Sequence, residues 1–119
     1  MYENKLSKLF SEVCNKNSFK TAIQINKKKI TYHELDHNSD KYKNFFFKKI
    51  KKKATILIEG KKNIETYYAI LGAIKSPFTY SIIDPKIPNE RFKKLYENKD
   101  FFLLYANKRF KKIKQNCNR

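Results

Sequence analysis

The segment ATILIEG, residues 54–60, decides the predicted fold. It is a continuous apolar run closed by Glu59-Gly60, which is typical of a strand buried on both faces of a parallel sheet. Two further apolar runs follow at residues 78–83 and 101–105, and a helical pattern precedes each of them. The alternation predicts a β-α-β-α-β unit over residues 54–105, in which right-handed crossovers join parallel strands.

Capping and turn residues mark the two helices of this unit. Asn63 can accept hydrogen bonds from the first-turn amides of the first helix, and Ser76-Pro77 ends that helix. Asp84-Pro85 turns the chain, and Pro88 suits the first turn of the second helix. The side chains expected to face inward are Tyr67, Ile70, Leu71 and Ile74 on the first helix, and Phe92, Leu95 and Tyr96 on the second.

Toward the N-terminus, the pattern predicts a helix followed by a β-hairpin. Apolar spacing indicates a helix over residues 4–15. Its expected inward stripe is Leu6, Leu9, Phe10 and Val13. Alternation at Ile23 and Ile25 indicates a short strand, Lys27 and Lys28 form the expected turn, and Ile30 begins the returning strand.

A capping box starts the next helix. Thr31 can accept a hydrogen bond from the Glu34 amide, while Glu34 reaches back to the Thr31 amide. The expected inward face is Leu35, Tyr42, Phe46 and Ile50. A lysine cluster at residues 48–53 lies near the C-terminus of this helix, where the helix dipole favours cations.

Composition limits the class of protein. The 119 residues carry a formal net charge of +17, are 40% hydrophobic and include only 2 Gly and 3 Pro, so the chain should fold as one small α/β domain. No apolar run is long enough to span a membrane and the start lacks the apolar core of a secretory signal, so we expect a soluble, cytoplasmic chain with no membrane partner. Cys14 and Cys117 have no CxxC spacing, which indicates two reduced thiols.

The positive charge allows an alternative function. Lysine-rich segments at residues 48–53 and 107–114 lie beside the Phe45–Phe47 run and Phe110, a mixture that can follow phosphates and stack bases. The cations are overwhelmingly lysine, and lysine, Asn, Ile, Phe and Tyr all have A/T-rich codons, so composition explains most of the charge. The alternative is therefore a small basic protein that binds nucleic acid or other polyanions non-specifically.

The run His33-Glu34-Leu35-Asp36-His37 also fits the H-E-x-x-H zinc pattern, in which two histidines bind the metal and the glutamate acts as a base. The capping box holds the glutamate against the backbone, and Asp40 and Lys43 occupy the Gly and His positions of the extended motif. A third ligand would have to come from Glu59 or Glu65. We expect two exposed histidines and assign no metal site.

Three stretches carry motifs in a fixed order. They are ITYHEL at residues 30–35, YAILGAIKSPFTYSIIDP at residues 68–85 and PNERF at residues 88–92. They resemble the blocks [LI]-T-Y-x-E-L, L-A-x-L-K-A-G-x-A-Y-x-P-[LI]-D-P and P-x-E-R-[LIF] at the start of adenylate-forming, or AMP-binding, enzymes. The chain is most similar to the amino-acid adenylation domains of peptide synthetases and to D-alanine:carrier-protein ligases, over about residues 4–106.

The chain departs from this family in two places and stops early. Ser76-Pro77 stands where the family usually has Ala-Gly, and Ile82 replaces a proline. The resemblance implies a later S-G-T-T-G-x-P-K-G loop for the ATP phosphates and a catalytic lysine on a separate C-terminal domain, and the chain ends before both. With only Gly60 and Gly72 available, no glycine-rich phosphate loop can be built.

No catalytic, cofactor-binding or metal residue is therefore assigned. The residues that match motif positions have expected roles in capping, helix termination and turn formation, and they are Thr31, Glu34, Lys75 and Asp84. ATP and Mg²⁺ are implied for the complete family enzyme, and so is a carrier protein. We expect residues 1–106 to be a truncated N-terminal part of an adenylation domain and residues 107–119 a basic tail.

The resemblance implies the opening segment of an ATP-dependent ligase that forms an aminoacyl or acyl adenylate. We expect the segment to be inactive alone, and to associate with the remaining part of a split ligase or with itself. The initial Met lies where such enzymes start, which favours a truncated or split enzyme. A gene remnant, a split-enzyme subunit and a repurposed module remain open, as do the substrate and the oligomeric state.

Overall fold

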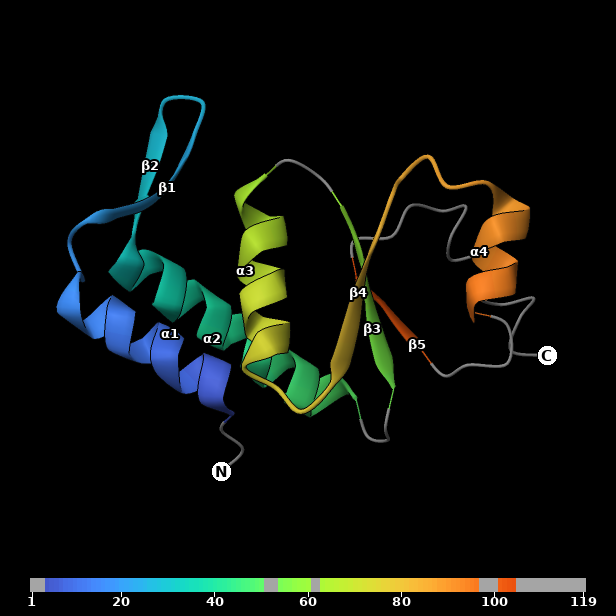
Figure 1. Cartoon of the computed structure of the whole chain (residues 1–119), viewed down its shortest axis with the longest axis horizontal. Coiled ribbons are helices and arrows are strands. Elements are labelled where there is room, and N and C mark those ends of the chain that lie inside the picture. Colours follow the sequence, from blue (N-terminus) through green and yellow to red (C-terminus); the bar gives the residue numbers. More distant parts are fainter. Residues whose placement is uncertain (1–3, 51–53, 61–62, 97–100, 105–119) are drawn as a thin grey trace.

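The expected β-α-β-α-β unit forms in the structure, which is a computed structural model. The structure describes residues 4–50, 54–60, 63–96 and 101–104. Residues 101–104 and Tyr96 are described by their backbone alone. The elements are β3 (Thr55–Glu59), α3 (Ile64–Ile74), β4 (Thr79–Ile83), α4 (Asn89–Tyr96) and β5 (Phe101–Leu104). The sheet order is β4-β3-β5, and both pairings are parallel. Thr55 pairs with Thr79 on one side and with Phe101 on the other (Figure 1). The predicted fold class is confirmed.

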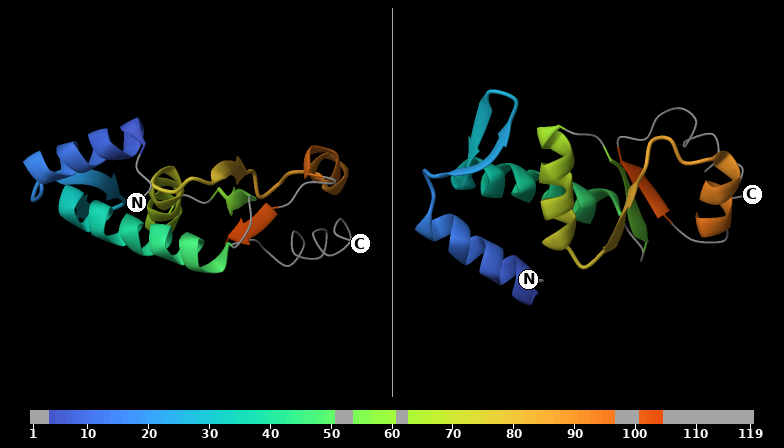
Figure 2. Two further views of the ribbon diagram at one scale, coloured as in Figure 1. Left: turned by 90° about the horizontal axis from the view of Figure 1, so that it is seen from below. Right: turned by 45° about the horizontal axis from the view of Figure 1, so that its top comes forward.

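The N-terminal half consists of two helices and a hairpin, as expected. The elements are α1 (Lys5–Lys16), β1 (Thr21–Ile25), β2 (Lys28–Thr31) and α2 (Tyr32–Lys49). In Figures 1 and 2, α3 lies between α1 and the sheet, α2 runs past α3 so that its C-terminal end reaches the sheet, and the hairpin projects beyond the helices. The turn lies one residue earlier than predicted, because Ile25 pairs with Lys28 and Asn26 takes a φ of 56°. Asparagine tolerates this left-handed conformation, whereas lysine rarely adopts it.

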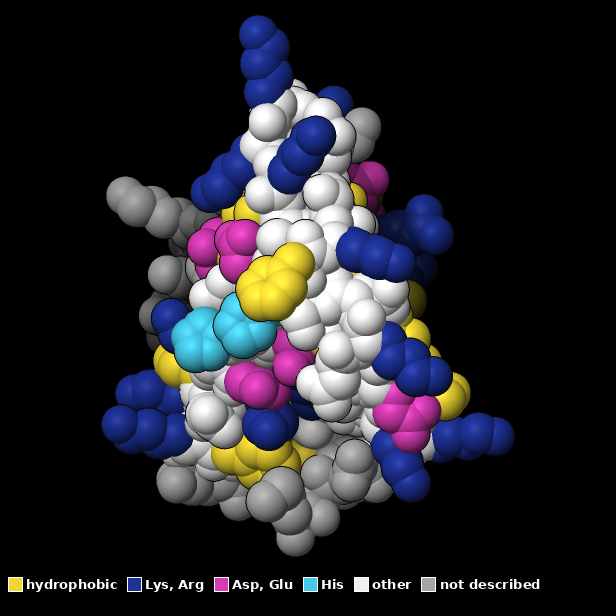
Figure 3. Space-filling view, turned by 90° about the vertical axis from the view of Figure 1, so that its left-hand side faces the viewer, with side chains coloured by type: hydrophobic (Ala, Val, Ile, Leu, Met, Phe, Trp, Pro, Cys, Tyr) yellow, Lys and Arg dark blue, Asp and Glu magenta, His cyan; other side chains and the backbone are white. Residues whose placement is uncertain are grey.

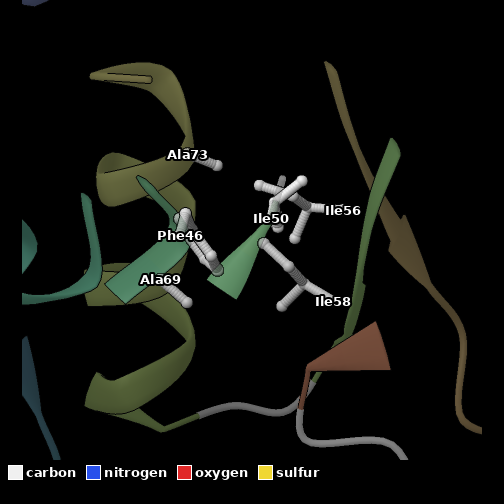
Figure 4. Close-up of a cluster of buried hydrophobic side chains, with 6 residues drawn as sticks. All are labelled: Phe46, Ile50, Ile56, Ile58, Ala69 and Ala73. Atoms are coloured by element: carbon white, nitrogen blue, oxygen red, sulfur yellow. The ribbon is translucent and has the colours of Figure 1, made fainter. Parts of the chain in front are cut away.

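A hydrophobic cluster joins α2, α3 and β3. Its buried members are Phe46, Ile50, Ile56, Ile58, Ala69 and Ala73. Figure 4 shows the six side chains directed into one space between α3 and β3. The two alanines leave room on α3 for the Phe46 ring, whose exposed fraction is 0%. This cluster fixes the position of both helices on one face of the sheet.

The sheet is buried at its centre and open at β4. Four consecutive residues of β3, from Ile56 to Glu59, are buried, which confirms the predicted strand with both faces covered. On β4, Ile82 is 52% exposed. β4 is therefore a partly uncovered edge of the sheet.

The predicted inward stripe of α1 is correct at Phe10, which is half-buried and packs against buried hydrophobic residues, but it is wrong at the other three positions. Leu6, Leu9 and Val13 are between 43% and 58% exposed, whereas Ser7 and Cys14 are buried. α1 packs against α2. The small Ser7 and Cys14 side chains permit a close approach of the two helices, and the leucines are left on the outer side.

The predicted inward stripe of α3 is correct only in part, since Ile70 and Leu71 are half-buried and pack against buried hydrophobic residues. Tyr67 is 41% exposed, and the buried residues of the helix are Thr66, Tyr68, Ala69, Gly72 and Ala73. A Cβ on Gly72 would lie 2.5 Å from the Tyr42 Cβ and 2.9 Å from backbone atoms of α2. Small residues therefore face α2, because its backbone passes too close for larger ones.

On α4, only part of the expected stripe is inward. Phe92 is completely buried, as predicted, whereas Leu95 is 45% exposed. The side chain of Tyr96 lies outside the described residues. The basic tail, the proposed domain boundary at residue 106 and Cys117 also lie outside the described residues.

Candidate functional site

A buried ammonium group joins the first three helices. Lys75 is the C-cap of α3, and its side chain is only 4% exposed. Its Nζ lies 2.6 Å from Asp36 Oδ1 and 2.8 Å from Asp40 Oδ1, both on α2. It also donates to the Asp36 carbonyl at 3.2 Å and lies 5.1 Å from the centroid of the Phe10 ring on α1. Lys75 thus does more than end a helix, which is all that the sequence predicted.

The local sequence explains this geometry. Asp36 and Asp40 are four residues apart on one helix, so both carboxylates project from the same face of α2. Asn4 reinforces the contact: its Oδ1 caps α1 by accepting from the Ser7 amide at 2.7 Å, and its Nδ2 donates to the Ile74 carbonyl at 2.8 Å. The N-terminus of α1 is thereby attached to the C-terminus of α3. The sequence spacing indicates that the two carboxylates share one face of α2, but only the folded structure shows that Lys75 contacts them.

The nearby thiol is not a candidate nucleophile. Cys14 on α1 is 2% exposed, and burial raises its pKa from 9.0 to about 11. The Asp36 carboxylate contributes to this rise in pKa, while Lys75 opposes it. A thiol nucleophile acts as the thiolate, which is disfavoured here. The helix contact built on Lys75, Asp36 and Asp40 therefore serves to hold the scaffold together.

The other motif positions have the predicted capping and turn roles, although the Glu34 carboxylate accepts from the Thr31 hydroxyl and not, as predicted, from the Thr31 amide. Thr31 is the N-cap of α2 and accepts from the Glu34 amide at 3.1 Å, and its hydroxyl donates to the Glu34 carboxylate at 3.2 Å. Asn63 caps α3 by accepting from the Thr66 amide at 3.0 Å. Asp84 closes a turn by accepting from the Lys86 amide at 2.9 Å.

The departure at Ser76-Pro77 is accommodated by a hydroxyl group. Ser76 is 3% exposed, and its Oγ donates to the Ala73 carbonyl at 2.7 Å. Among the described residues only Asn26 has a positive φ, so this connection needs no glycine. A proline is therefore compatible with the turn.

The two histidines lie together at the surface. The rings of His33 and His37 have centroids 6.3 Å apart and are nearly parallel, at 9°. Figure 3 shows the imidazoles side by side, with acidic side chains on either side of them. Neither acidic residue considered as a third ligand joins them: Glu65 accepts a hydrogen bond from the Tyr42 hydroxyl, and Glu59 is buried at the end of β3. Within the described part of the chain, no three His, Cys, Asp or Glu side chains form a metal-binding group.

Only the middle ring of the aromatic run on α2 belongs to the core. Phe46 is completely buried, and Phe47, at 41% exposed, packs against Phe78 with ring centroids 5.9 Å apart. Phe45 is 37% exposed and lies edge-on to Phe46. The three rings therefore do not form an open stacking surface. The lysines at 51–53 and 107–114 lie outside the described residues.

No helix in the described ranges is both long and apolar enough to cross a membrane.

Two hollows lie beside the helices. The larger, of about 510 Å³, separates the N-terminus of α1 from the α3–β4 connection, and Leu6, Ile74 and Phe78 are among its lining residues. The smaller, of about 370 Å³, lies between the hairpin turn and Asn63. Neither contains a convergent set of catalytic groups.

Sequence comparison matches residues 10–117 to the family of AMP-binding enzymes. The chain is 31% identical over 90 residues to gramicidin S synthase 2 of Brevibacillus brevis. This match covers 75% of this chain but only 2% of the synthase. It is 27% identical over 107 residues to gramicidin S synthase 1 of the same organism, covering 89% of this chain and 10% of the synthase. The chain thus spans a small part of these relatives.

Solved structures show the same fold. The N-terminal subdomain of Klebsiella oxytoca NpsA, in complex with 3-hydroxyanthranilyl-AMSN, has a TM-score of 0.74 at 16% identity, covering 94% of this chain and 31% of the subdomain. PA1221, a non-ribosomal peptide synthetase (NRPS) protein containing adenylation and PCP domains, has a TM-score of 0.67 at 18% identity, covering 76% of this chain and 19% of that protein. The scaffold is therefore similar to part of an adenylation N-terminal subdomain.

Proposed function

This chain belongs to the AMP-binding enzyme family, and from that premise we propose that it is an N-terminal fragment of an ATP-dependent ligase that forms an aminoacyl or acyl adenylate. The fragment supplies the scaffold of α2, α3 and the parallel sheet, and it makes no adenylate by itself. One observation carries the proposal: nearly the whole chain is similar to a solved N-terminal subdomain, yet it corresponds to only 31% of that subdomain.

The described residues do not fit an ATP site. A phosphate loop needs glycines whose backbone amides can approach the phosphates. Gly72 is packed against α2. The Gly60 amide donates to the Ile83 carbonyl at 2.8 Å, and a Cβ there would lie 3.0 Å from Ile82. Both glycines of the chain thus have packing roles, and ATP and Mg²⁺ binding is assigned to the rest of the enzyme.

The inactivity is tested by ATP–pyrophosphate exchange across the amino acids and small aryl and acyl acids. We expect the chain alone to show no exchange above the rate without protein, while a complete adenylate-forming enzyme assayed in parallel is active. Robust exchange by the chain alone would overturn the proposal. Gly72→Ala, which we expect to destabilise the contact between α2 and α3, is the control: exchange activity that is unchanged in this variant comes from a contaminating enzyme.

We also propose that the remaining part of the ligase covers the open side of this fragment. Ile82 on the edge strand β4 is half exposed, and Leu6 lines the hollow beside the α3–β4 connection. A parallel sheet is normally covered on both faces and continued at its edges. Without the remaining part, these surfaces favour association between copies of the chain, which the charge of +17 opposes.

Sedimentation velocity tests this association. Because salt screens the charge, we expect the apparent mass of the chain to rise from low to high salt. The edge variant Ile82→Glu should lower the mass at high salt without changing the helical circular dichroism. A strictly monomeric chain at every salt concentration, with no binding of a hydrophobic dye, would contradict an exposed docking surface. A carrier protein is a partner of the complete enzyme only.

A further inference from the structure

The two histidines on α2 form a surface feature that the proposed ligase does not use. His33 and His37 are the only two histidines of the chain, and both are exposed. They are four residues apart on one helix, so their side chains project from the same face. Their rings are already nearly parallel, with centroids 6.3 Å apart.

The backbone that carries these side chains is held firmly. The His33 amide donates to the Ser18 carbonyl at 3.0 Å, and the Tyr32 amide donates to the Lys20 carbonyl at 3.0 Å. Thr31 caps the same turn, and the next turn is fixed by the contact of Asp36 with Lys75. Only side-chain rotation is therefore needed to turn both imidazoles toward one point. This limits the conformational entropy lost when they share a ligand.

The spacing of the rings suits a shared metal ion. An ion bound at about 2.0–2.1 Å from one nitrogen of each imidazole, with an angle of about 90–110° between the two bonds, places the two ring centroids roughly 4.5–5.2 Å apart. The observed separation of 6.3 Å needs a closure of about 1–2 Å, which rotation of the two side chains can supply. Imidazole nitrogen is a preferred ligand of Zn²⁺, Ni²⁺ and Cu²⁺, whereas Mg²⁺ and Ca²⁺ prefer oxygen.

We propose that His33 and His37 bind one divalent transition-metal ion, of the class Ni²⁺, Cu²⁺ or Zn²⁺, through one nitrogen of each ring. Water completes the coordination, because Glu34 accepts from the Thr31 hydroxyl at 3.2 Å and Asp36 contacts Lys75. The site binds the ion without the hydrolytic chemistry of a zinc protease, since its glutamate belongs to the helix cap. The acidic side chains beside the imidazoles offset locally the positive charge of the chain (Figure 3).

The test is titration of the whole chain with Ni²⁺, followed by calorimetry. We expect one ion per chain, a higher melting temperature in the presence of Ni²⁺, and no binding of Mg²⁺ under the same conditions. The decisive variant exchanges two exposed residues, His37→Lys with Lys41→His. It keeps the composition, the charge and both cysteines, but moves the second imidazole about 12 Å along the helix from His33.

We expect the exchange variant to bind Ni²⁺ at least about tenfold more weakly, because loss of a direct ligand should cost at least as much as loss of an outer-shell partner. The melting temperature of this variant should not respond to Ni²⁺. His33→Gln, which removes the other imidazole, should behave in the same way, and circular dichroism checks that both variants remain folded. If either folded variant binds Ni²⁺ as tightly as the natural chain, other groups bind the ion and the proposal is overturned. The proposal is also overturned if the natural chain does not bind Ni²⁺.

Discussion

The contact between α2 and α3 and the outer face of α1 differ in which kinds of side chain they bury. At the first, Gly72 lies against the α2 backbone and Lys75 is buried beside two carboxylates. At the second, Leu6, Leu9 and Val13 are about half exposed. The difference shows that close backbone approach, more than hydrophobicity, selects the buried face of these short helices.

The largest expected effect lies at the first region. Gly72→Ala places a Cβ 2.5 Å from Tyr42 and 2.9 Å from the α2 backbone, which cannot move independently. We expect the free energy of unfolding to fall by about 3 kcal/mol. Urea unfolding followed by circular dichroism measures it.

Gly60→Ala is the matched control for this substitution. Its nearest neighbour is the Ile82 side chain at 3.0 Å, and that side chain is half exposed and can move. We expect a change of about 1 kcal/mol or less. Equal effects at the two glycines would show that the α2–α3 contact is looser than the structure indicates.

The next effect concerns the buried ammonium group. Exchanging both carboxylates for amides, Asp36→Asn with Asp40→Asn, leaves the 4% exposed Lys75 without an anion and should lower stability by about 2 kcal/mol. Lys75→Met should cost about 1 kcal/mol or less, because the carboxylates that it leaves are 29% and 45% exposed. Unfolding curves of both variants give the comparison.

The triple variant that combines these three changes sharpens the prediction. With the buried charge removed, it should be more stable than the doubly amidated variant. If Lys75→Met instead lowers stability more than the loss of both carboxylates, the ammonium group is better hydrated than its burial implies.

A smaller effect depends on pH. The pKa of Cys14 rises from 9.0 in the unfolded chain to about 11 in the fold, so folding favours the neutral thiol. The stabilisation is present below pH 9 and is lost as the pH rises toward 11, because the unfolded chain ionises first. Burial raises the pKa of Tyr68 as well, which acts in the same direction at higher pH.

Between pH 9 and pH 11, we expect the free energy of unfolding of Cys14→Ala to fall by about 1–2 kcal/mol less than that of the natural chain. Unfolding of both chains at a series of pH values measures the difference. Parallel curves for the variant and the natural chain would mean that the thiol ionises as easily in the fold as in the unfolded chain.

The smallest effect is expected at the second region. Changing Leu6, Leu9 and Val13 together to Gln should alter stability by only about 0.5 kcal/mol, since these side chains gain little from burial in the fragment. Binding of a hydrophobic dye should fall, because the exposed apolar surface is reduced. A loss of several kcal/mol in the unfolding free energy would show that the stripe is buried, as its spacing alone had suggested.

The sequence by itself determined the order of the elements and most of their ends. Apolar runs gave the three parallel strands, and Thr31, Asn63 and Asp84 marked two helix starts and a turn, because caps and turns depend on neighbours within a few residues. The motifs were also sufficient to indicate the family. The placement of the hairpin turn differed by one residue, since the left-handed tolerance of Asn26 outweighed the polarity of the following lysines.

Only the tertiary structure decided which helix faces are buried and which polar groups meet. Apolar periodicity cannot distinguish a stripe that packs from one that stays exposed, and on α1 and α3 small residues such as Ser7 and Gly72 took the buried positions. The contact of Lys75 with Asp36 joins residues 39 positions apart, and no local pattern specifies it. The physical reason is that burial and ion pairing depend on the distance between whole elements, which the packing of backbones sets.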